Sequence, residues 1–448
     1  MLTITSATRI VVDESTERDG DLVLRDGVVS AGRPAGRTEA AVAGDQDETL
    51  DASGCVITPG LVNAHHHLLQ SAFRSLPGTR GVAMRDWLPT MAAAYARAGV
   101  DAELAHAAAS VGVAEGLLCG VTTVADHHLT WPGGSNTAGS NTAGIDSVAI
   151  ATATADAARS LGGRLVFVRG SARDDPQEAA ISAEAIVQTL LPRTADGMLQ
   201  LAVGPAGVHS DSREAFELLA GIAAQYGLRR RTQANEQVDV ATALERYGKR
   251  PIDLLEDWGW LEPGVTLAHL CDVTEDEIRR LAASGITATH APGCDLPMGW
   301  GIAPVAALRT AGIAVGLGTS GGGSNDAGHL LADARLAMQV APLVGPPISA
   351  REVLGMATAG SAAGLGRPEL GTLRPGSAAD LCLWDVSGVA DAGVADPVAG
   401  LLWANPGRRP KHVVVAGRVV VRDYELVNAD ERELVARLAD RVPRVPTQ

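Results

Sequence analysis

Three consecutive histidines, His65, His66 and His67, end a strand-like apolar run and are the first candidates for chemistry in this sequence. Because successive side chains of a strand point to opposite faces, His65 and His67 share one face and His66 faces the other way. Two imidazoles in an H-x-H pattern can bind one metal ion. A histidine-rich loop without a metal has the same spacing, so the spacing alone leaves both interpretations open.

The run that positions these histidines is one of eight, and helix-like segments separate the runs. The apolar runs cover 55–64, 121–126, 164–171, 199–207, 228–236, 265–270, 287–292 and 313–320. Eight strands alternating with helices predict an α/β fold, a (β/α)8 TIM barrel. The polar residues at the run ends are His65, Asp126, Ser171, His209, Glu236, His269, His290 and Ser320. Catalytic groups of such barrels gather at the carboxyl ends of the strands, so we expect one site there.

The two chain ends differ from the middle, because they hold short alternating strands and tight turns. Chain termini often lie close together, so we expect 1–56 and 366–448 to form a small composite β-sandwich domain beside a barrel of 57–365. The locally repetitive segment 135–144 is typical of a mobile loop, which we place over the barrel mouth.

Composition excludes several classes of partner. The 448 residues carry a formal charge of −15, which argues against nucleic acid and anionic membranes. The sequence has no apolar run of about 18 residues and no signal-peptide pattern at its N-terminus. Its five scattered cysteines form no C-x-x-C pair and are typical of buried thiols in a reduced compartment. We therefore expect a cytoplasmic protein, and a homodimer or higher homo-oligomer.

Several long segments carry a resemblance to a known family. They are PGLVNAHHHLLQSAFRSLP, CGVTTVADHHLTWPG, VTLAHLCDVTEDEIRRLAASGITATHAPGCDLPMGWGIAPV, GTSGGGSND and LGTLRPGSAADLCLWDV. In this order they resemble the amidohydrolase superfamily, in its cytosine deaminase-like branch, and especially triazine hydrolases and 8-oxoguanine deaminases. The resemblance implies a barrel with a composite β-domain, one divalent metal such as Zn2+, and hydrolytic removal of a substituent from a small purine, pyrimidine or triazine.

The resemblance also assigns roles residue by residue. The family binds its metal with H-x-H on the first strand, a histidine on the fifth and an aspartate on the eighth. His65 and His67 match the first pair. His269 matches a sixth-strand histidine, and Glu236 matches the acid that follows the fifth-strand histidine; both handle protons in the family. Gln70 matches a glutamine that contacts the heterocycle.

Two metal positions depart from this pattern. Gln233 stands where the family has the fifth-strand histidine, and Ser320 where it has the aspartate. A glutamine carbonyl is a weak zinc ligand, and serine removes a negative charge. Some triazine hydrolases also have a hydroxyl residue at the eighth-strand position, so Ser320 stays a catalytic candidate. His65, His67 and His269 can still form a three-histidine site if His269 becomes a ligand.

The fifth strand-like run, LRRRTQANE, is unusually basic for a barrel interior. Alternation counted from Gln233 places Arg231 on the same side, one layer beneath the expected metal and within reach of Gln233 or Glu236. A permanent guanidinium charge there repels a dication and can replace it electrostatically. A shifted register would instead turn this arginine outward, to solvent or to a subunit interface.

The candidates for substrate contact have competing structural interpretations. They are Gln70, Trp87, His128, Arg231, Gln233 and Asn325. Trp87 can wall the pocket or belong to the core, and Asn325 can cap the next helix. Of the neighbours His127 and His128, only one can face inward, and we expect His128 to contact substrate.

Three functions stay open. The first is an amidohydrolase-type hydrolase of C–N bonds, in which metal-bound hydroxide attacks the ring, Glu236 protonates a ring nitrogen and His269 steers the water. The second is a metal-independent enzyme of secondary metabolism, with the same fold, that acts on a related heterocycle by chemistry that need not be hydrolytic. The third is a non-catalytic binding protein. A binder needs no proton relay, so Glu236 and His269 argue against the third.

Overall fold

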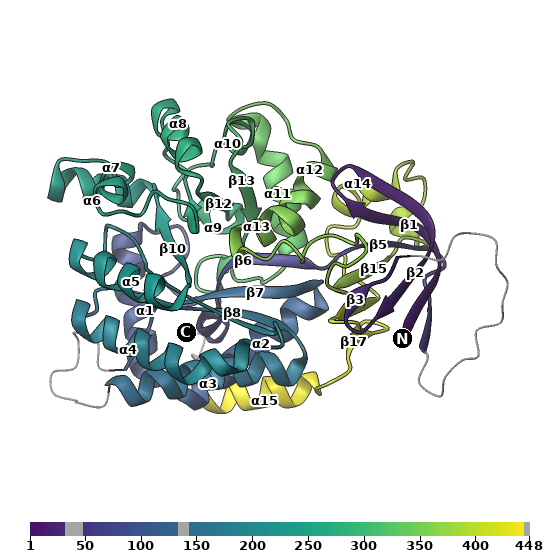
Figure 1. The fold of residues 1–448 in the computed structure, drawn as a ribbon, viewed down its shortest axis with the longest axis horizontal. Coiled ribbons are helices and arrows are strands. Elements are labelled where there is room, and N and C mark those ends of the chain that lie inside the picture. The colour runs from purple at the N-terminus through teal and green to yellow at the C-terminus, as the bar shows by residue number, and fades with distance from the viewer. Residues whose placement is uncertain (32–47, 133–142, 443–448) are drawn as a thin grey trace.

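The computed structural model describes residues 1–31, 48–132 and 143–442. Two sheets dominate it: a barrel surrounded by helices, and a second sheet at the opposite end of the molecule, where the N-terminus lies (Figure 1). Residues 135–142 of the expected mobile loop fall outside the described residues. In the described part of the chain, no helix is long and apolar enough to cross a membrane.

The barrel sheet confirms the predicted fold class. Its strands, all parallel, are β6 (Leu61–His67), β7 (Val121–His128), β8 (Arg164–Ser171), β9 (Leu199–Pro205), β10 (Arg229–Ala234), β11 (Val265–His269), β12 (Thr287–His290), β13 (Ala314–Leu317) and β14 (Ser320–Gly321). β13 and β14 are two parts of the eighth strand. The sheet closes because β13 pairs with β12 while β14 pairs with β6.

The run expected as one strand over 55–64 is divided between the two sheets. β5 (Cys55–Pro59) pairs with strands of the second sheet, whereas β6 opens the barrel. Gly60 joins them, and a Cβ there would collide with the Thr122 side chain. Glycine is thus needed where the chain passes closely from one sheet to the other.

Helices surround the barrel; most of them join the strands in one large apolar core, while the buried residues of α1 lie in a separate apolar cluster. They are α1 (Met84–Ala98), α2 (Ala102–Leu118), α3 (Ala143–Leu161), α4 (Pro176–Leu190), α5 (Arg213–Tyr226), α6 (Gln237–Tyr247), α7 (Pro251–Asp257), α8 (Glu275–Ser284), α9 (Pro292–Asp295), α10 (Val305–Thr310), α11 (Leu330–Val340), α12 (Ala350–Gly355) and α13 (Ser361–Leu365). Side-chain caps begin several of them; the Asp101 carboxylate, for example, accepts from the Leu104 amide at the start of α2.

The second sheet combines both ends of the chain. Its strands are β1 (Leu2–Asp13), β2 (Thr16–Arg25), β3 (Val28–Val29), β4 (Glu48–Asp51), β5, β15 (Leu381–Asp385), β16 (His412–Val415), β17 (Arg418–Arg422) and β18 (Glu425–Leu426). The short helix α14 (Pro397–Trp403) lies between β15 and β16 in the sequence. The last helix, α15 (Glu431–Arg441), instead lies along α2 of the barrel, where Arg441 pairs with Asp101 and Glu103 (Figure 1). The division into two domains stays a prediction.

Candidate active site

His65 and His67 lie side by side at the carboxyl end of β6, with ring centroids 4.9 Å apart. The Nδ1–H of His67 donates to the carbonyl of His127 over 2.7 Å, so its Nε2 keeps a lone pair. Nε2 of His65 is buried and has no hydrogen-bond partner. Burial, together with the neighbouring His67 and His269, holds the pKa of His65 well below its usual range. Both rings are therefore neutral and able to offer a nitrogen.

His127, and not His128, is the residue of β7 that faces these histidines. Its ring centroid lies 5.9 Å from that of His65 and 6.0 Å from that of His67. His128 turns away, because its ring packs against Trp131 and Phe167. The substrate contact expected of His128 therefore has no geometric support, and His127 takes the inward position.

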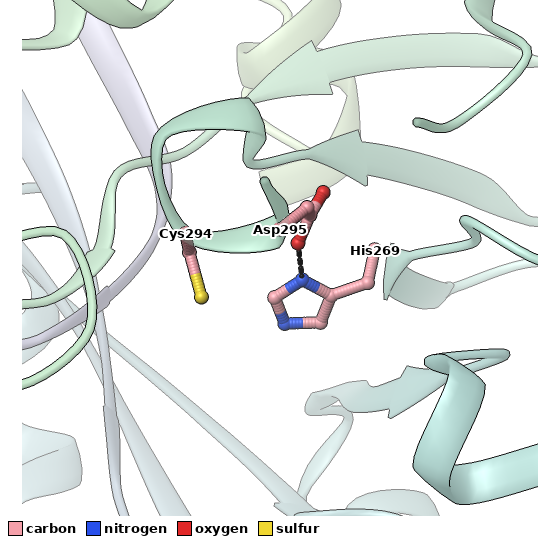
Figure 2. A group of neighbouring side chains, drawn as sticks. All are labelled: His269, Cys294 and Asp295. Atoms are coloured by element: carbon pink, nitrogen blue, oxygen red, sulfur yellow. Dashed lines mark hydrogen bonds and ion pairs between the residues drawn. The ribbon is translucent and has the colours of Figure 1, made fainter. Parts of the chain in front are cut away.

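His269, at the end of β11, is held from both ring nitrogens. Its Nδ1–H donates to Asp295 over 2.6 Å, as Figure 2 shows. Its Nε2 lies 3.0 Å from Oε1 of Gln233. The Gln233 amide NH2 donates to the carbonyl of Ala206, so the oxygen must face His269. Both nitrogens thus carry protons, and His269 is an imidazolium.

His269 and Asp295 each stabilise the charged form of the other. Burial opposes the charge of both side chains, but their mutual attraction and hydrogen bond outweigh it. The pKa of His269 is raised, and that of Asp295 is lowered to about 2. Neither Asp295 nor Trp300 was predicted as a site residue. The ring centroid of Trp300 lies 5.1 Å from that of His269. Asp295 ends the short helix α9 just after β12, and its position after a strand-like run was the available signal.

Glu236 is the other acid of the site, and its carboxylate is unusual. Oε1 lies 3.7 Å from Nε2 of His269, and both carboxylate oxygens are buried without a hydrogen-bond partner. Although the residue stands at the N-cap of α6, its side chain caps nothing. Burial raises its pKa, against the opposing charges of His269 and His209.

Three of the predicted substrate contacts have hydrogen-bond partners in or next to the loop after β14. Oε1 of Gln70 accepts from the Gly323 amide, and Nε1 of Trp87 donates to the Gly323 carbonyl, both over 3.0 Å. Asn325 donates to the carbonyl of Thr319 over 2.8 Å. These bonds give Gln70, Trp87 and Asn325 structural partners.

Arg231 lies inside the barrel, on the side predicted from the alternation of side chains along the strand. Its guanidinium donates to the carbonyl of Ala64 and, over 3.4 Å, to that of Gly364. The expected contact with Gln233 or Glu236 is absent from its hydrogen bonds in the described part of the chain, because the side chain extends into the layer below. Burial lowers its pKa to about 9 and its charge lowers the pKa of His65. A cation without an ion-pair partner among the described residues therefore lies beneath the histidines.

The donors around the expected metal position offer fewer free lone pairs than the family pattern implies. His269 donates from both nitrogens, and the Gln233 oxygen accepts one of those protons. Ser320, in a left-handed backbone conformation, pairs with His66 and supplies no charge. In the described residues, three ligand atoms of His, Cys, Asp or Glu side chains lie within 4.8 Å of one another only at His269, Cys294 and Asp295. Figure 2 shows this group, to which neither His65 nor His67 belongs.

Comparison with known proteins identifies relatives of this chain. The amidohydrolase family model matches residues 56–420. The 8-oxoguanine deaminase of Pseudomonas aeruginosa is 34% identical over 435 residues, 93% of each chain. An isoxanthopterin deaminase from an unknown prokaryotic organism is 31% identical over 88% of this chain and 86% of its own. The crystal structure of atrazine chlorohydrolase from Arthrobacter aurescens complexed with zinc matches with a TM-score of 0.87 at 34% identity, covering 99% of this chain and 100% of that one.

Proposed function

Because this chain belongs to the amidohydrolase family, we propose that it is a hydrolase of C–N bonds that removes an amino group, or another ring substituent, from a small N-heterocycle. The observation that carries the proposal is Glu236, a buried carboxyl without a hydrogen-bond partner beside the imidazolium of His269. Keeping such a group buried costs stability, and perturbed carboxyls at the carboxyl ends of barrel strands are typical of catalytic sites.

The raised pKa of Glu236 suits it to take up and return one proton. In the proposed reaction, Glu236 accepts a proton from water as the water oxygen bonds to the ring carbon. The same proton then goes to the departing amino group, and the C–N bond breaks to release ammonia. His269 keeps its charge throughout, because Asp295 compensates it, and that charge holds the Glu236 carboxylate toward the reacting carbon.

Relatives support a nitrogen heterocycle as substrate. Two of them are deaminases named for fused heterocycles, 8-oxoguanine and isoxanthopterin, and a solved relative is named for the triazine atrazine. The substrate that we propose is an aminated purine, pteridine, pyrimidine or triazine. Of the predicted contacts, Gln233 is the one beside Glu236 and His269. The catalytic candidate Ser320 begins β14, which pairs with β6.

We further propose that the residues at this position cannot bind zinc, the metal of the solved relative, in the way that the family's ligands do. His65 and His67 have free nitrogens, but the third ligand considered, His269, has no lone pair left, and Gln233 and Ser320 offer only neutral oxygens. The cation of Arg231 beneath the site adds repulsion to a dication. This supports the metal-independent form of the hydrolase.

Location and assembly are also proposals. In the described residues the five cysteines are free, which supports a reducing compartment such as the cytoplasm. A homodimer stays our expectation for the assembly, and sedimentation of the purified protein tests it.

Ammonia release tests the function. Purified protein is incubated with paired aminated purines, pteridines, pyrimidines and triazines, with and without EDTA. We expect ammonia from at least one compound and release at least about 100-fold slower with Glu236→Gln. Release should be unchanged with the control His106→Gln, whose imidazole lies on α2 away from the site. Ammonia release by Glu236→Gln at the wild-type rate would remove the proposed role of this acid. If EDTA abolished activity and added zinc restored it, metal independence would be contradicted but the proposed hydrolysis would stand.

A further inference from the structure

His209 follows β9 at the carboxyl end of the fourth barrel strand, and its ring folds back over Gly207. A Cβ on Gly207 would lie 2.7 Å from Nδ1 and 2.8 Å from Cε1 of that ring, and 3.2 Å from the carbonyl oxygen of Gln233. At these distances a side chain at position 207 would force the imidazole to shift. The glycine therefore admits the imidazole to a place against the main chain of the fifth strand.

Asp239 fixes both His209 and the turn that carries Glu236. Its Oδ1 lies 3.2 Å from Nδ1 of His209, and its Oδ2 accepts from the backbone amide of Asn235 over 2.9 Å. Asp239 is fully buried, and Asn235 has a left-handed backbone conformation just before Glu236. One carboxylate therefore sets the position of His209 relative to Glu236.

The two side chains act on each other electrostatically without forming an ion pair. Each shifts the pKa of the other, but in the described residues no nitrogen of His209 lies within 4.0 Å of a Glu236 carboxylate oxygen. Burial lowers the pKa of His209, but the Asp239 hydrogen bond and the charges of Glu236 and Asp239 raise it to about 9. Its Nε2, which has no hydrogen bond to the described residues, therefore carries a proton at neutral pH.

We propose that His209 is a specificity-determining residue that donates its Nε2–H to an exocyclic oxygen of the heterocycle. The assignment rests on the proposed function, and it narrows the substrate to an amino heterocycle that also carries an oxo group. Glu236 handles protons at the reacting carbon, while His209 binds the oxygen at another point of the same ring system. The distance of more than 4.0 Å between the His209 nitrogens and the Glu236 oxygens suits a fused or substituted ring.

Binding of matched ligand pairs tests this assignment. The pairs are guanine with 2-aminopurine and isocytosine with 2-aminopyrimidine, and in each pair only the first compound carries an oxo group. Dissociation constants are measured in the Glu236→Gln background, so that turnover does not consume the ligand. A hydrogen bond from a charged donor is worth about 10- to 100-fold in affinity, so at least one oxo compound should bind tighter than its partner by that factor.

His209→Leu should reduce the preference to about onefold while leaving the affinity for the partner compound unchanged. Gly207→Ala should act in the same direction, because the added methyl displaces the imidazole. His106→Gln, which removes an imidazole from α2, should keep the full preference.

Equal affinity within both pairs, no binding by any of the four compounds, or a preference that survives His209→Leu would overturn the assignment. The proposed function is judged separately by ammonia release from the wild-type protein. If no ammonia is released while His209→Leu abolishes the oxygen preference, the hydrolase proposal fails and the recognition by His209 stands.

Discussion

Replacing Asp295 by asparagine removes the charge that compensates the His269 imidazolium. Interactions in the folded protein lower the Asp295 pKa from 3.8 to about 2, which corresponds to about 2 kcal/mol of unfolding free energy at neutral pH. Breaking a buried ion pair also leaves an uncompensated charge, with losses of about 3–5 kcal/mol. We therefore expect Asp295→Asn to lower the unfolding free energy by about 2–5 kcal/mol, toward the lower end if His269 then loses its proton.

The pH dependence follows from the directions of the two shifts. Asp295 has a lowered pKa in the folded protein, so it contributes its full stabilisation of the fold above its unfolded pKa of 3.8. This contribution is lost as the pH falls through about 2. His269, a base with a raised folded pKa, stabilises fully below its unfolded value, 6.5, and loses this as the pH rises through the raised value. The difference between wild type and Asp295→Asn should therefore be largest between pH 3.8 and 6.5.

Urea unfolding of both proteins at pH 6 and at alkaline pH measures this difference. A linear extrapolation gives the unfolding free energy, and the midpoint alone gives the sign if an intermediate is populated. Equal midpoints at pH 6, or a difference that grows toward alkaline pH, would refute the imidazolium–carboxylate assignment.

Three further substitutions test the neighbouring groups. Glu236→Gln should lower kcat/KM by about 100- to 10,000-fold. It should not lower the unfolding free energy at neutral pH, because an acid with a raised folded pKa destabilises increasingly above its unfolded value, 4.5; ammonia assays and urea unfolding measure both effects. Gln233→His combined with Ser320→Asp should raise zinc content toward one per chain by elemental mass spectrometry, and a folded, zinc-free double variant would contradict this. Adding Arg231→Met should raise zinc retention further, and unchanged retention would show that its charge is irrelevant.

The fold was predictable because its signals are local and repeated. Eight apolar runs, each ending in a polar residue, indicated a closed barrel, and the structure confirms it. The division of the first run at Gly60 was not predictable, because the apolar pattern is continuous there. The reason for the glycine is the side chain of Thr122, which is distant in the sequence and meets Gly60 only in the folded protein.

The site was predictable in part, where a residue's face follows from strand alternation. His65 and His67 share a face, and Arg231 lies inside the barrel. The choice between His127 and His128 depended on which ring packs against Trp131, and one sequence does not contain that information.

Hydrogen-bond partners that come from other helices or strands could not be predicted from the sequence. Asp295 reaches His269 from a short helix after the next strand, and Asp239 reaches His209 from the helix after the following strand. Neither pair has a spacing that a single strand or helix would produce, because each depends on how adjacent strands of the barrel place their loops.

The central claim is that this chain hydrolyses a C–N bond of an amino heterocycle with Glu236 as the proton carrier. The most direct measurement is mass spectrometry of the product formed in water enriched in oxygen-18, with ammonia measured in the same reaction. We predict one labelled oxygen atom and one ammonia for each product molecule from the wild-type protein, and product formation at least about 100-fold slower by Glu236→Gln. A product without the labelled oxygen, or labelled product formed equally well by Glu236→Gln, would contradict it.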